Sequence, residues 1–496
     1  MQMKIKFMQL GKCIMANLAI FVTLFMASCS SSDAPDPSAG EPEVIYKGNV
    51  AYSSSILFND GKDMGNGTQN FHFTGDVTLE KGTYMLKGWV YVEAGARLII
   101  PAGTIIKGDK QTMAALIVEP GGYVEMNGTK DAPIVMTSAQ APGQRRPGDW
   151  GGLIICGYAR NNQHTMQIEG GPTTIHGGNN DNDNSGIYQY VRVEFAGYPF
   201  DTDKEINGVT FGSVGRGTTI HHIQVSYSND DSFEWFGGTV DCNYLVAYKG
   251  WDDEFDTDNG FSGNVEYCLS VRDPRIADTS QSNGFESDNN ASGAETTPFT
   301  SAKFKHVTLI GPMTPQNAGF TNSSDYITAG SVFPNNGSKL GKFQSAMQIR
   351  RSSKLNAENI LAVGYPIGLI LDGEKGNSVS YAKNGELRLR NIIFADMGII
   401  GSDKNKLYED YLFDYSTSTE DKSLTSFSHS FFLSNTTNRV MDGSALNLTD
   451  PVGLGQNYCP ATELSDGQGG YIGAFMNSAD NWLEGWTNFN PQNTTY

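Results

Sequence analysis

The chain has 496 residues, and its 54 acidic and 35 basic side chains give a formal net charge of −19. This charge argues against nucleic acids and anionic membranes as partners, because both repel a polyanion. Hydrophobic residues make up 39% of the chain, which excludes a disordered protein, and the 57 glycines show no collagen-like period and indicate many tight turns.

The N-terminus carries the features of an export signal. Three lysines precede a short apolar stretch that ends in Met26-Ala27-Ser28-Cys29, a sequence that resembles the lipobox of bacterial lipoproteins. We therefore expect residues 1–28 to be a lipoprotein signal peptide, Cys29 to be lipidated and residues 29–45 to be a flexible tether. The alternative is an ordinary secretory signal in which Cys29 is coincidental. Lipidation would place the protein at the outer membrane, on the cell surface, held by its lipid anchor alone.

An internal repeat begins after the tether, where residues 90–98 are echoed by residues 116–124, 26 positions later. Each copy alternates apolar and polar residues, turns at glycine and alternates again, which predicts strand–turn–strand rather than helix. A period of this length without a helical face is typical of a β-solenoid, whose coils stack about 4.8 Å apart. We predict an all-β fold, a right-handed parallel β-helix over residues 46–400, with a β-sandwich array as the alternative.

The same alternation continues along the chain with irregular spacing. It covers residues 187–195, 220–225, 244–247, 265–271, 304–310, 347–350, 360–363, 367–371 and 387–394. Irregular coil lengths favour a β-helix, because its turns accept insertions. The pattern weakens from residue 401, so residues 401–496 are expected to hold terminal coils and a C-terminal cap. We expect residues 408–415, residues 427–433 and the Trp-rich tail to cover the last coil, whose sheet edge would otherwise be exposed.

Several glycine- and tryptophan-containing motifs are shared with one exported family. They are Gly148-Asp149-Trp150-Gly151-Gly152-Leu153-Ile154 and the segments 169–171, 176–178, 184–186, 191–197, 471–475 and 482–487. Through them the chain resembles the pectin-lyase-like β-helix proteins of Bacteroidota, many of which are outer-surface lipoproteins, over roughly residues 85–490. The resemblance implies the fold and the location. It does not imply an activity, because members are mostly described by fold alone.

Acidic residues recur in register along the central coils. Asn229-Asp230-Asp231-Ser232-Phe233-Glu234 returns 22 residues later as Trp251-Asp252-Asp253-Glu254-Phe255-Asp256, and Ser282-Asn283-Gly284-Phe285-Glu286 follows 30 residues after that. Because equivalent positions of successive coils stack, we expect acidic columns beside a buried aromatic stack. The columns are Glu234/Asp256/Glu286, Asp230/Asp252 and Asp231/Asp253, and the stack is Phe233/Phe255/Phe285.

Stacked carboxylates repel each other and need a cation, a proton or a basic partner. Three interpretations follow: the acids bind a metal, with Ca²⁺ as the first candidate; they act as general acid and base in glycoside hydrolysis; or they cap turns and face solvent. The candidate catalytic residues are Asp230, Asp231, Glu234, Asp252, Asp253 and Arg272. Arg272 would be the base of a polysaccharide lyase, whereas Arg350 and Arg351 are expected to pair with the acids.

Two loops suggest calcium independently of these columns. Asp181-Asn182-Asp183-Asn184-Ser185-Gly186 follows the spacing that wraps oxygen ligands around a cation, and Asp288-Asn289-Asn290-Ala291-Ser292-Gly293 repeats it. The candidate ligands are Asp181, Asp183, Asp288 and Asn290. Neither loop is an EF-hand, since position twelve of the first is Arg192 rather than glutamate. A non-helical Ca²⁺ loop and an Asx-turn are both open.

The expected function is non-catalytic capture of a glycan or peptide ligand, beside a TonB-dependent nutrient importer. This role rests on the family resemblance and the expected location. Trp235 and Trp251 would stack on sugar rings beside Asp256 and Glu286, although these aromatics fit repeat packing equally well. The alternatives are a carbohydrate-active enzyme, either a lyase or a glycoside hydrolase, and an adhesin or structural surface protein.

Overall fold

The computed structural model describes residues 44–46, 51–54, 57–58, 63–201 and 204–496. The predicted signal peptide and Cys29 lie outside the described residues, as does nearly all of the predicted tether. None of the helices in the described ranges is long and apolar enough to cross a membrane.

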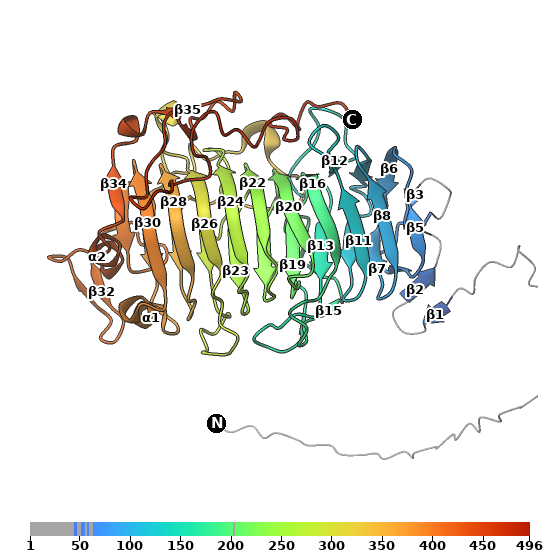
Figure 1. Ribbon diagram of the computed structural model, residues 1–496, viewed down its shortest axis with the longest axis horizontal. Helices are drawn as coiled ribbons and strands as arrows, with labels where there is room; N and C mark the ends of the chain where they lie inside the picture. Colours follow the sequence, from blue (N-terminus) through green and yellow to red (C-terminus); the bar gives the residue numbers. More distant parts are fainter. Residues whose placement is uncertain (1–43, 47–50, 55–56, 59–62, 202–203) are drawn as a thin grey trace, which may run out of the picture. The chain divides into compact units, whose positions relative to one another are not determined.

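Two long sheets stack the coils of a parallel β-helix, which confirms the predicted fold (Figure 1). Sheet A has 13 strands. In spatial order they are β1 (Val44–Tyr46), β2 (Ala51–Ser54), β4 (Phe71–Phe73), β7 (Trp89–Val92), β10 (Ala115–Val118), β13 (Gly152–Cys156), β19 (Val209–Gly212), β21 (Phe233–Phe236), β23 (Phe255–Asp258), β25 (Phe285–Ser287), β27 (Ser345–Ile349), β29 (Ile367–Leu371) and β31 (Ile399–Ser402). Only β1 and β2 pair antiparallel among the described strands of this sheet.

Sheet B has 15 strands. They are β3 (Asp63–Met64), β5 (Asp76–Thr78), β6 (Thr83–Leu86), β8 (Arg97–Pro101), β9 (Ile105–Gly108), β11 (Tyr123–Asn127), β12 (Ile134–Ser138), β16 (Gly186–Glu194), β20 (Thr219–Ser226), β22 (Cys242–Tyr248), β24 (Asn264–Val271), β26 (Lys303–Ile310), β28 (Asn356–Val363), β30 (Arg388–Ala395) and β34 (Arg439–Met441). From β16 to β30 each coil spans this sheet with one long strand.

Short elements fill the turns between coils. The helices are α1 (Ser378–Asn384), α2 (Phe427–Ser434) and the 3-10 turns η1 (Pro315–Asn317), η2 (Gly330–Val332) and η3 (Gly443–Leu446). The hairpins are β14 (Met166–Gln167) with β15 (Ile175–His176), β17 (Pro199–Asp201) with β18 (Lys204–Glu205), β32 (Leu412–Asp414) with β33 (Thr419–Asp421), and β35 (Leu448–Thr449) with β36 (Cys459–Pro460).

The core is built from side chains that alternate inward along each strand and stack from coil to coil. The predicted aromatic stack is confirmed, since the ring of Phe255 lies 5.8 Å from that of Phe233 and 5.7 Å from that of Phe285. These three residues are cross-strand partners in sheet A. Their register fixes which side chains of the same strands point outward.

Each long strand of sheet B bends at one residue with a left-handed backbone. The bend residues are Tyr190, His222, Tyr244, Tyr267, His306, Asn359 and Asn391, with φ between 50° and 60°. This conformation costs roughly 1–2 kcal/mol for a residue other than glycine. Ring stacking offsets part of the cost, because Tyr190, His222 and Tyr244 stack with centroids 4.4 Å apart. The bend divides sheet B into a first and a second segment with separate outer faces.

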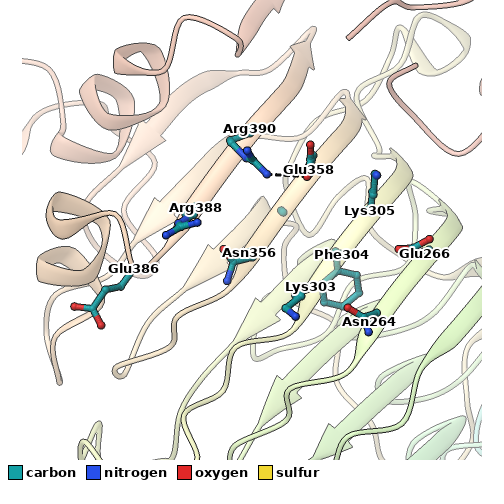
Figure 2. Close-up of a pocket in the computed structure, with 11 residues that line it drawn as sticks. Asn264, Glu266, Lys303, Phe304, Lys305, Asn356, Glu358, Glu386, Arg388 and Arg390 are labelled. Atoms are coloured by element: carbon teal, nitrogen blue, oxygen red, sulfur yellow. Dashed lines mark hydrogen bonds and ion pairs between the residues drawn. The ribbon is translucent and has the colours of Figure 1, made fainter. Parts of the chain in front are cut away.

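The three outer faces of the β-helix differ in what covers them. A groove lies over the central strands of sheet A, and a pocket lies over β24 to β30 on the first segment of sheet B, with its lining residues drawn in Figure 2. The second segment of sheet B is covered by the C-terminal tail, which runs back along the stack (Figure 1). Asn488 of the tail bonds to Gln224, and the hydroxyl of Tyr496 donates to Glu194 at 2.6 Å.

Of the segments expected to cap the stack, residues 427–433 lie at its end and the Trp-rich tail does not. Helix α2 lies against β29 and β31, and Phe432 stacks on Phe394 with ring centroids 4.1 Å apart. The Trp-rich tail does not cover this coil. It packs along the flank instead, where Trp486 and Trp482 contact the bend residues His222 and Tyr244.

Candidate acidic groove on sheet A

One row of outward side chains along sheet A changes from apolar to acidic. By cross-strand register it runs Tyr91, Ile117, Ile154, Thr210, Glu234, Asp256, Glu286, Gln348. The apolar half is covered, since Ile168 and Ile206, from the insertion between β13 and β19, pack on it. Where that cover ends, the row becomes acidic and open. The predicted column of Glu234, Asp256 and Glu286 is therefore present.

An open groove of about 470 Å³ lies over this part of the sheet. Its carboxylates are Glu169, Glu205, Asp230, Asp231, Glu234, Asp252, Asp253, Asp256, Asp258, Glu286 and Asp288. Arg350 and Arg351 are the basic residues that line it. We call this surface the acidic groove.

Two of the predicted catalytic acids instead hold the turns between coils together. The Oδ1 atom of Asp231 accepts a hydrogen bond from the backbone N–H of Asp253 at 2.8 Å. Asp253 accepts from the N–H of Asn283 in the same way, and Asn283 accepts from the N–H of Ser345 at 3.1 Å. This ladder of side-chain acceptors matches the turn-capping interpretation for Asp231 and Asp253.

Five acids of the groove converge in two groups of three, which share Asp231. Oxygen atoms of Asp230, Asp231 and Asp252 lie within 4.8 Å of one another, and so do those of Asp231, Glu234 and Asp256. Within the described residues, none of these carboxylates forms an ion pair with a basic side chain. We call the two groups the carboxylate triplets. Each offers hard oxygen ligands at a spacing that a divalent cation can bridge.

Crowding and burial make these carboxyl groups hard to ionise. Burial and then the charge of Asp252 raise the pKa of Asp230, and burial and then Asp256 raise that of Glu234. Burial and the neighbouring Asp288 raise the pKa of Asp258 to about 8. The groove must therefore take up either protons or a cation to exist in this form at neutral pH.

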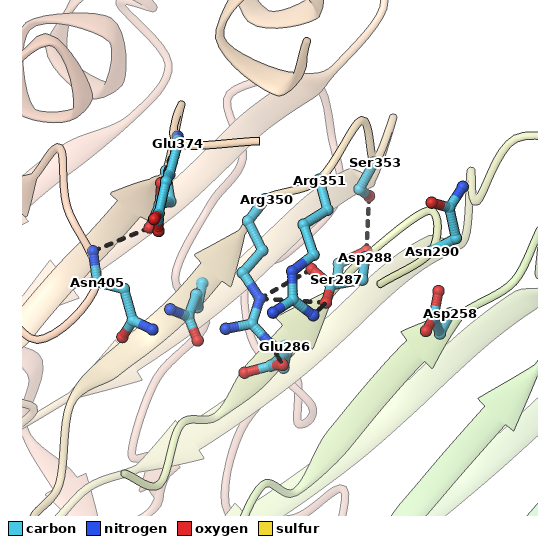
Figure 3. A network of polar contacts seen from close by, with 12 residues as sticks. Asp258, Glu286, Ser287, Asp288, Asn290, Arg350, Arg351, Ser353, Glu374 and Asn405 are labelled. Atoms are coloured by element: carbon cyan, nitrogen blue, oxygen red, sulfur yellow. Dashed lines mark hydrogen bonds and ion pairs between the residues drawn. The ribbon is translucent and has the colours of Figure 1, made fainter. Parts of the chain in front are cut away.

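The far end of the acidic groove carries its own positive charge (Figure 3). Arg350 donates through Nε to Asp288 at 2.9 Å and also reaches Glu286, while Arg351 donates to Asp288 at 2.6 Å. The predicted pairing with the acidic column is confirmed for Arg350, which contacts Glu286, whereas Arg351 pairs with Asp288 outside the column. The pairing neutralises Glu286 and Asp288 but leaves the triplets at the other end uncompensated.

Arg272 does not reach the groove, so the prediction that it is a lyase base is wrong. Its side chain is fully buried and its guanidinium contacts the carboxylate of Glu254 at 2.8 Å. It also donates to the backbone carbonyl of Asp252 at 2.6 Å. The residue follows β24 at a corner where the chain turns inward, and Glu254 is its buried counter-ion.

The predicted exposed aromatic surface is also absent from the described structure. Trp235 is an inward residue of β21, packed between the rings of Phe211 and Phe261 at 5.2 and 5.3 Å. Trp251 is equally buried and contacts Phe333. Neither indole can stack on a sugar ring, so repeat packing is the correct interpretation of both.

The two predicted calcium loops satisfy their acids from within the chain. Asp181 pairs with Arg160, and Asp183 accepts from the hydroxyl of Ser185 at 3.2 Å. In the second loop Asp288 pairs with arginines, while the Oδ1 atom of Asn290 accepts from Ser292 and from the N–H of Ala294 at 3.0 Å. These contacts favour Asx-turns at both loops. Calcium stays a prediction, and the carboxylate triplets are the better place for it.

Sequence reasoning did not place three acids in the groove. Asp258 stands two residues after Asp256, on the same face of β23, and strand alternation could have revealed it. Glu169 and Glu205 come from the insertion between β13 and β19. No repeat in the sequence signals them, because the insertion interrupts the coil pattern.

Comparisons with known proteins agree with this architecture. No curated protein and no solved structure matches the chain. The family model of the pectate-lyase-like beta helix domain matches residues 71–431, which include every strand that forms the acidic groove. The chain therefore belongs to the family of proteins with a pectate-lyase-like β-helix domain.

Proposed function

We propose that the acidic groove captures a glycan through bound divalent cations, with Ca²⁺ as the first candidate, and does not cleave it. The two carboxylate triplets carry this proposal. Three carboxylates whose oxygens lie within 4.8 Å of one another, without a basic partner in the described chain, match the ligand set that Ca²⁺ prefers. A bound cation would leave coordination sites for sugar hydroxyl or carboxylate oxygens.

The arrangement of bases favours capture over a lyase reaction. A lyase needs a free basic group beside the substrate, and Arg272 is buried against Glu254. Arg350 and Arg351 line the groove but are engaged with Glu286 and Asp288. Asp231 and Asp253 each accept a hydrogen bond from a backbone N–H group through Oδ1, which leaves the Oδ2 atom of Asp231 for a cation.

Glycoside hydrolysis is a second candidate, favoured by the raised pKa values. Burial and like charge raise the pKa of Asp230 and Asp252, so one of them could donate a proton at neutral pH. A retaining glycosidase separates its two carboxyl groups by about 5–5.5 Å, and an inverting one separates them by about 6.5–9.5 Å to admit water. The triplets are more crowded than that, which suits a shared cation better.

The location is proposed from the N-terminal sequence. Lipidation of Cys29 would hold the groove at the cell surface, beside a TonB-dependent importer that receives the captured glycan. Replacing Cys29 with alanine should release the chain from the membrane fraction at high salt. Unchanged fractionation of the Cys29→Ala chain with membranes would reject the lipid anchor.

The capture proposal is tested by calorimetric titration of the protein with Ca²⁺ and by glycan-array binding with and without EDTA. Asp252→Asn combined with Asp256→Asn removes one carboxylate from each triplet and should abolish the Ca²⁺ isotherm and the EDTA-sensitive glycan signal. Glu484→Gln, an exposed acid outside the groove, is the control and should change neither. Glycan binding that survives both EDTA and the double substitution would refute capture through a cation. Cleaved glycan products would instead support the hydrolase.

A further inference from the structure

A second ligand-sized depression lies on the first segment of sheet B, away from the acidic groove. It has a volume of about 440 Å³ and is formed by outward side chains of β24, β26, β28 and β30 (Figure 2). Lys303, Lys305, Arg388 and Arg390 line it, together with Asn264 and Asn356. We call this surface the cationic terrace. It is unusual in a chain of net charge −19.

Cross-strand register arranges the terrace in two parallel rows. The first row is Asn264, Lys303, Asn356, Arg388, and the second is Glu266, Lys305, Glu358, Arg390. The second row alternates in charge and compensates itself, since Arg390 contacts Glu358 at 2.9 Å and Lys305 is the cross-strand partner of Glu266. The first row contains two cations and two amides but no acid.

The cations of the first row have no carboxylate partner within the described chain. Lys303 is exposed and forms no ion pair there. Arg388 donates through Nε to the carbonyl of Gly385 at 2.7 Å, which orients the guanidinium and leaves its terminal nitrogens free. Glu386, two residues before Arg388, is paired with Lys354 at 2.7 Å. The row therefore presents two surplus positive charges to solvent.

The spacing of these charges suits a linear polyanion. Lys303 on β26 and Arg388 on β30 are two strands apart, which corresponds to roughly 10 Å along the stack. Asn356 lies between them and offers an amide to a neutral hydroxyl. A guanidinium binds carboxylate or sulfate through paired N–H donors, whereas lysine acts as a point charge.

We propose that the cationic terrace binds an acidic polysaccharide, with the anionic groups of two nearby sugars on Lys303 and Arg388. The chain of sugars follows the first row, across the strands and along the stack. Carboxylate- and sulfate-bearing glycans share the chemistry that these residues recognise. Binding here needs no divalent cation, so this site is independent of the acidic groove and of the function proposed for it.

The test is isothermal titration of the full chain in EDTA with three oligosaccharides of equal length: an oligogalacturonate, a sulfated oligosaccharide and a neutral glucan. We expect binding of at least one anionic probe, no binding of the neutral one, and weakening by added salt. The preferred anionic probe tells carboxylate from sulfate recognition. Lys303→Gln with Arg388→Gln should weaken this binding by about tenfold or more, because two charge-assisted contacts are lost.

The matched control is Lys305→Gln with Arg390→Gln, which removes the same charge from the same terrace. Because these residues already balance Glu266 and Glu358, we expect it to weaken binding by less than about threefold. Failure of both anionic probes to bind in EDTA would overturn the proposal. So would equal losses in the two double variants, or equally tight binding of a single-stranded DNA of the same charge. Circular dichroism would verify folding of both variants.

Discussion

Arg272 and Arg350 both contact carboxylates, yet they play different parts. Arg350 spans Glu286 and Asp288 at the rim of the groove, where it adjusts the local charge. Arg272 and Glu254 form a pair with both side chains fully buried. A buried pair contributes little net stability while intact, but either partner is costly when left alone.

Arg272→Ala should therefore destabilise the fold strongly without acting on any groove chemistry. We expect the free energy of unfolding to fall by about 3–5 kcal/mol, because Glu254 would keep a buried charge without its counter-ion. Urea denaturation of both chains measures this. Lys422→Ala removes an exposed ion pair with Glu409 and should cost no more than about 1 kcal/mol. A loss below that limit for Arg272→Ala would contradict the structural role.

Asp256 is a buried acceptor without a donor, since its Oδ1 atom has no hydrogen-bond partner in the described structure. Burial and then Glu286 raise its pKa. Asp256→Asn should raise the melting temperature in EDTA, because it removes a repelling charge from the column. The same substitution should shrink the stabilisation that added Ca²⁺ gives to the native chain. Differential scanning fluorimetry in both buffers measures the two effects, and a lower melting temperature in EDTA would contradict the account.

The acidic groove, which includes Asp258, makes the stability of the protein depend on pH. The pKa of Asp258 is raised to about 8 in the folded state, against about 3.9 in an unfolded chain. A carboxyl group whose pKa is raised on folding contributes stability at pH values below its unfolded pKa. This stability is lost as the pH rises through its folded pKa. In EDTA the stability advantage of Asp258→Asn over the native chain should therefore grow between about pH 4 and about pH 8.

The difference in stability between Asp258→Asn and the native chain does not contain the contribution of the histidines, because the same histidines titrate in both chains. Burial lowers the pKa of His222 to about 4 and that of His176 to about 3, so both oppose the trend in the native chain alone. Chemical denaturation at several pH values gives the difference curve. A curve that is flat with pH would show that Asp258 titrates normally, and saturating Ca²⁺ is expected to flatten it.

The repeating elements were predictable from the sequence, and the insertions were not. The offset between Asp230 and Asp252 gave the coil register, and with it the column of Glu234, Asp256 and Glu286. Period-two alternation also implied that Trp235 lies on the inward face with Phe233, although it was assigned to the surface. Glu169 and Glu205 reach the groove through an insertion, whose path depends on tertiary packing that no local pattern encodes.

At the scale of the whole molecule, the tail supplies partners to charges buried in early coils. Arg145 donates to the backbone carbonyls of Pro491 and Thr494, and Tyr496 donates to Glu194. Both Arg145 and Glu194 are almost fully buried. The sequence expectation of a cap at the last coil overlooked these contacts, since they join residues about three hundred positions apart.

Deleting residues 488–496 should lower the free energy of unfolding by at least about 3 kcal/mol, because buried charges would lose their partners. Urea denaturation and limited proteolysis measure the loss. Glu194→Gln in the shortened chain should recover part of it, because burial already raises the pKa of Glu194 and disfavours its charge. If the shortened chain is as stable as the native one, the tail contributes nothing to the free energy of unfolding.

The C-terminal tail also affects how cooperatively the β-helix unfolds. Solenoids behave as one-dimensional arrays in which each coil senses its neighbours, so their ends can fray independently. Here the segment that bonds to Asn359 through Gly473 continues back to Gln224 and Glu194, many coils earlier. The C-terminal tail therefore connects distant coils, and we expect these coils to unfold together. Because the tail follows in the sequence all the coils that it contacts, the flank of a nascent β-helix would stay open until the tail has left the ribosome.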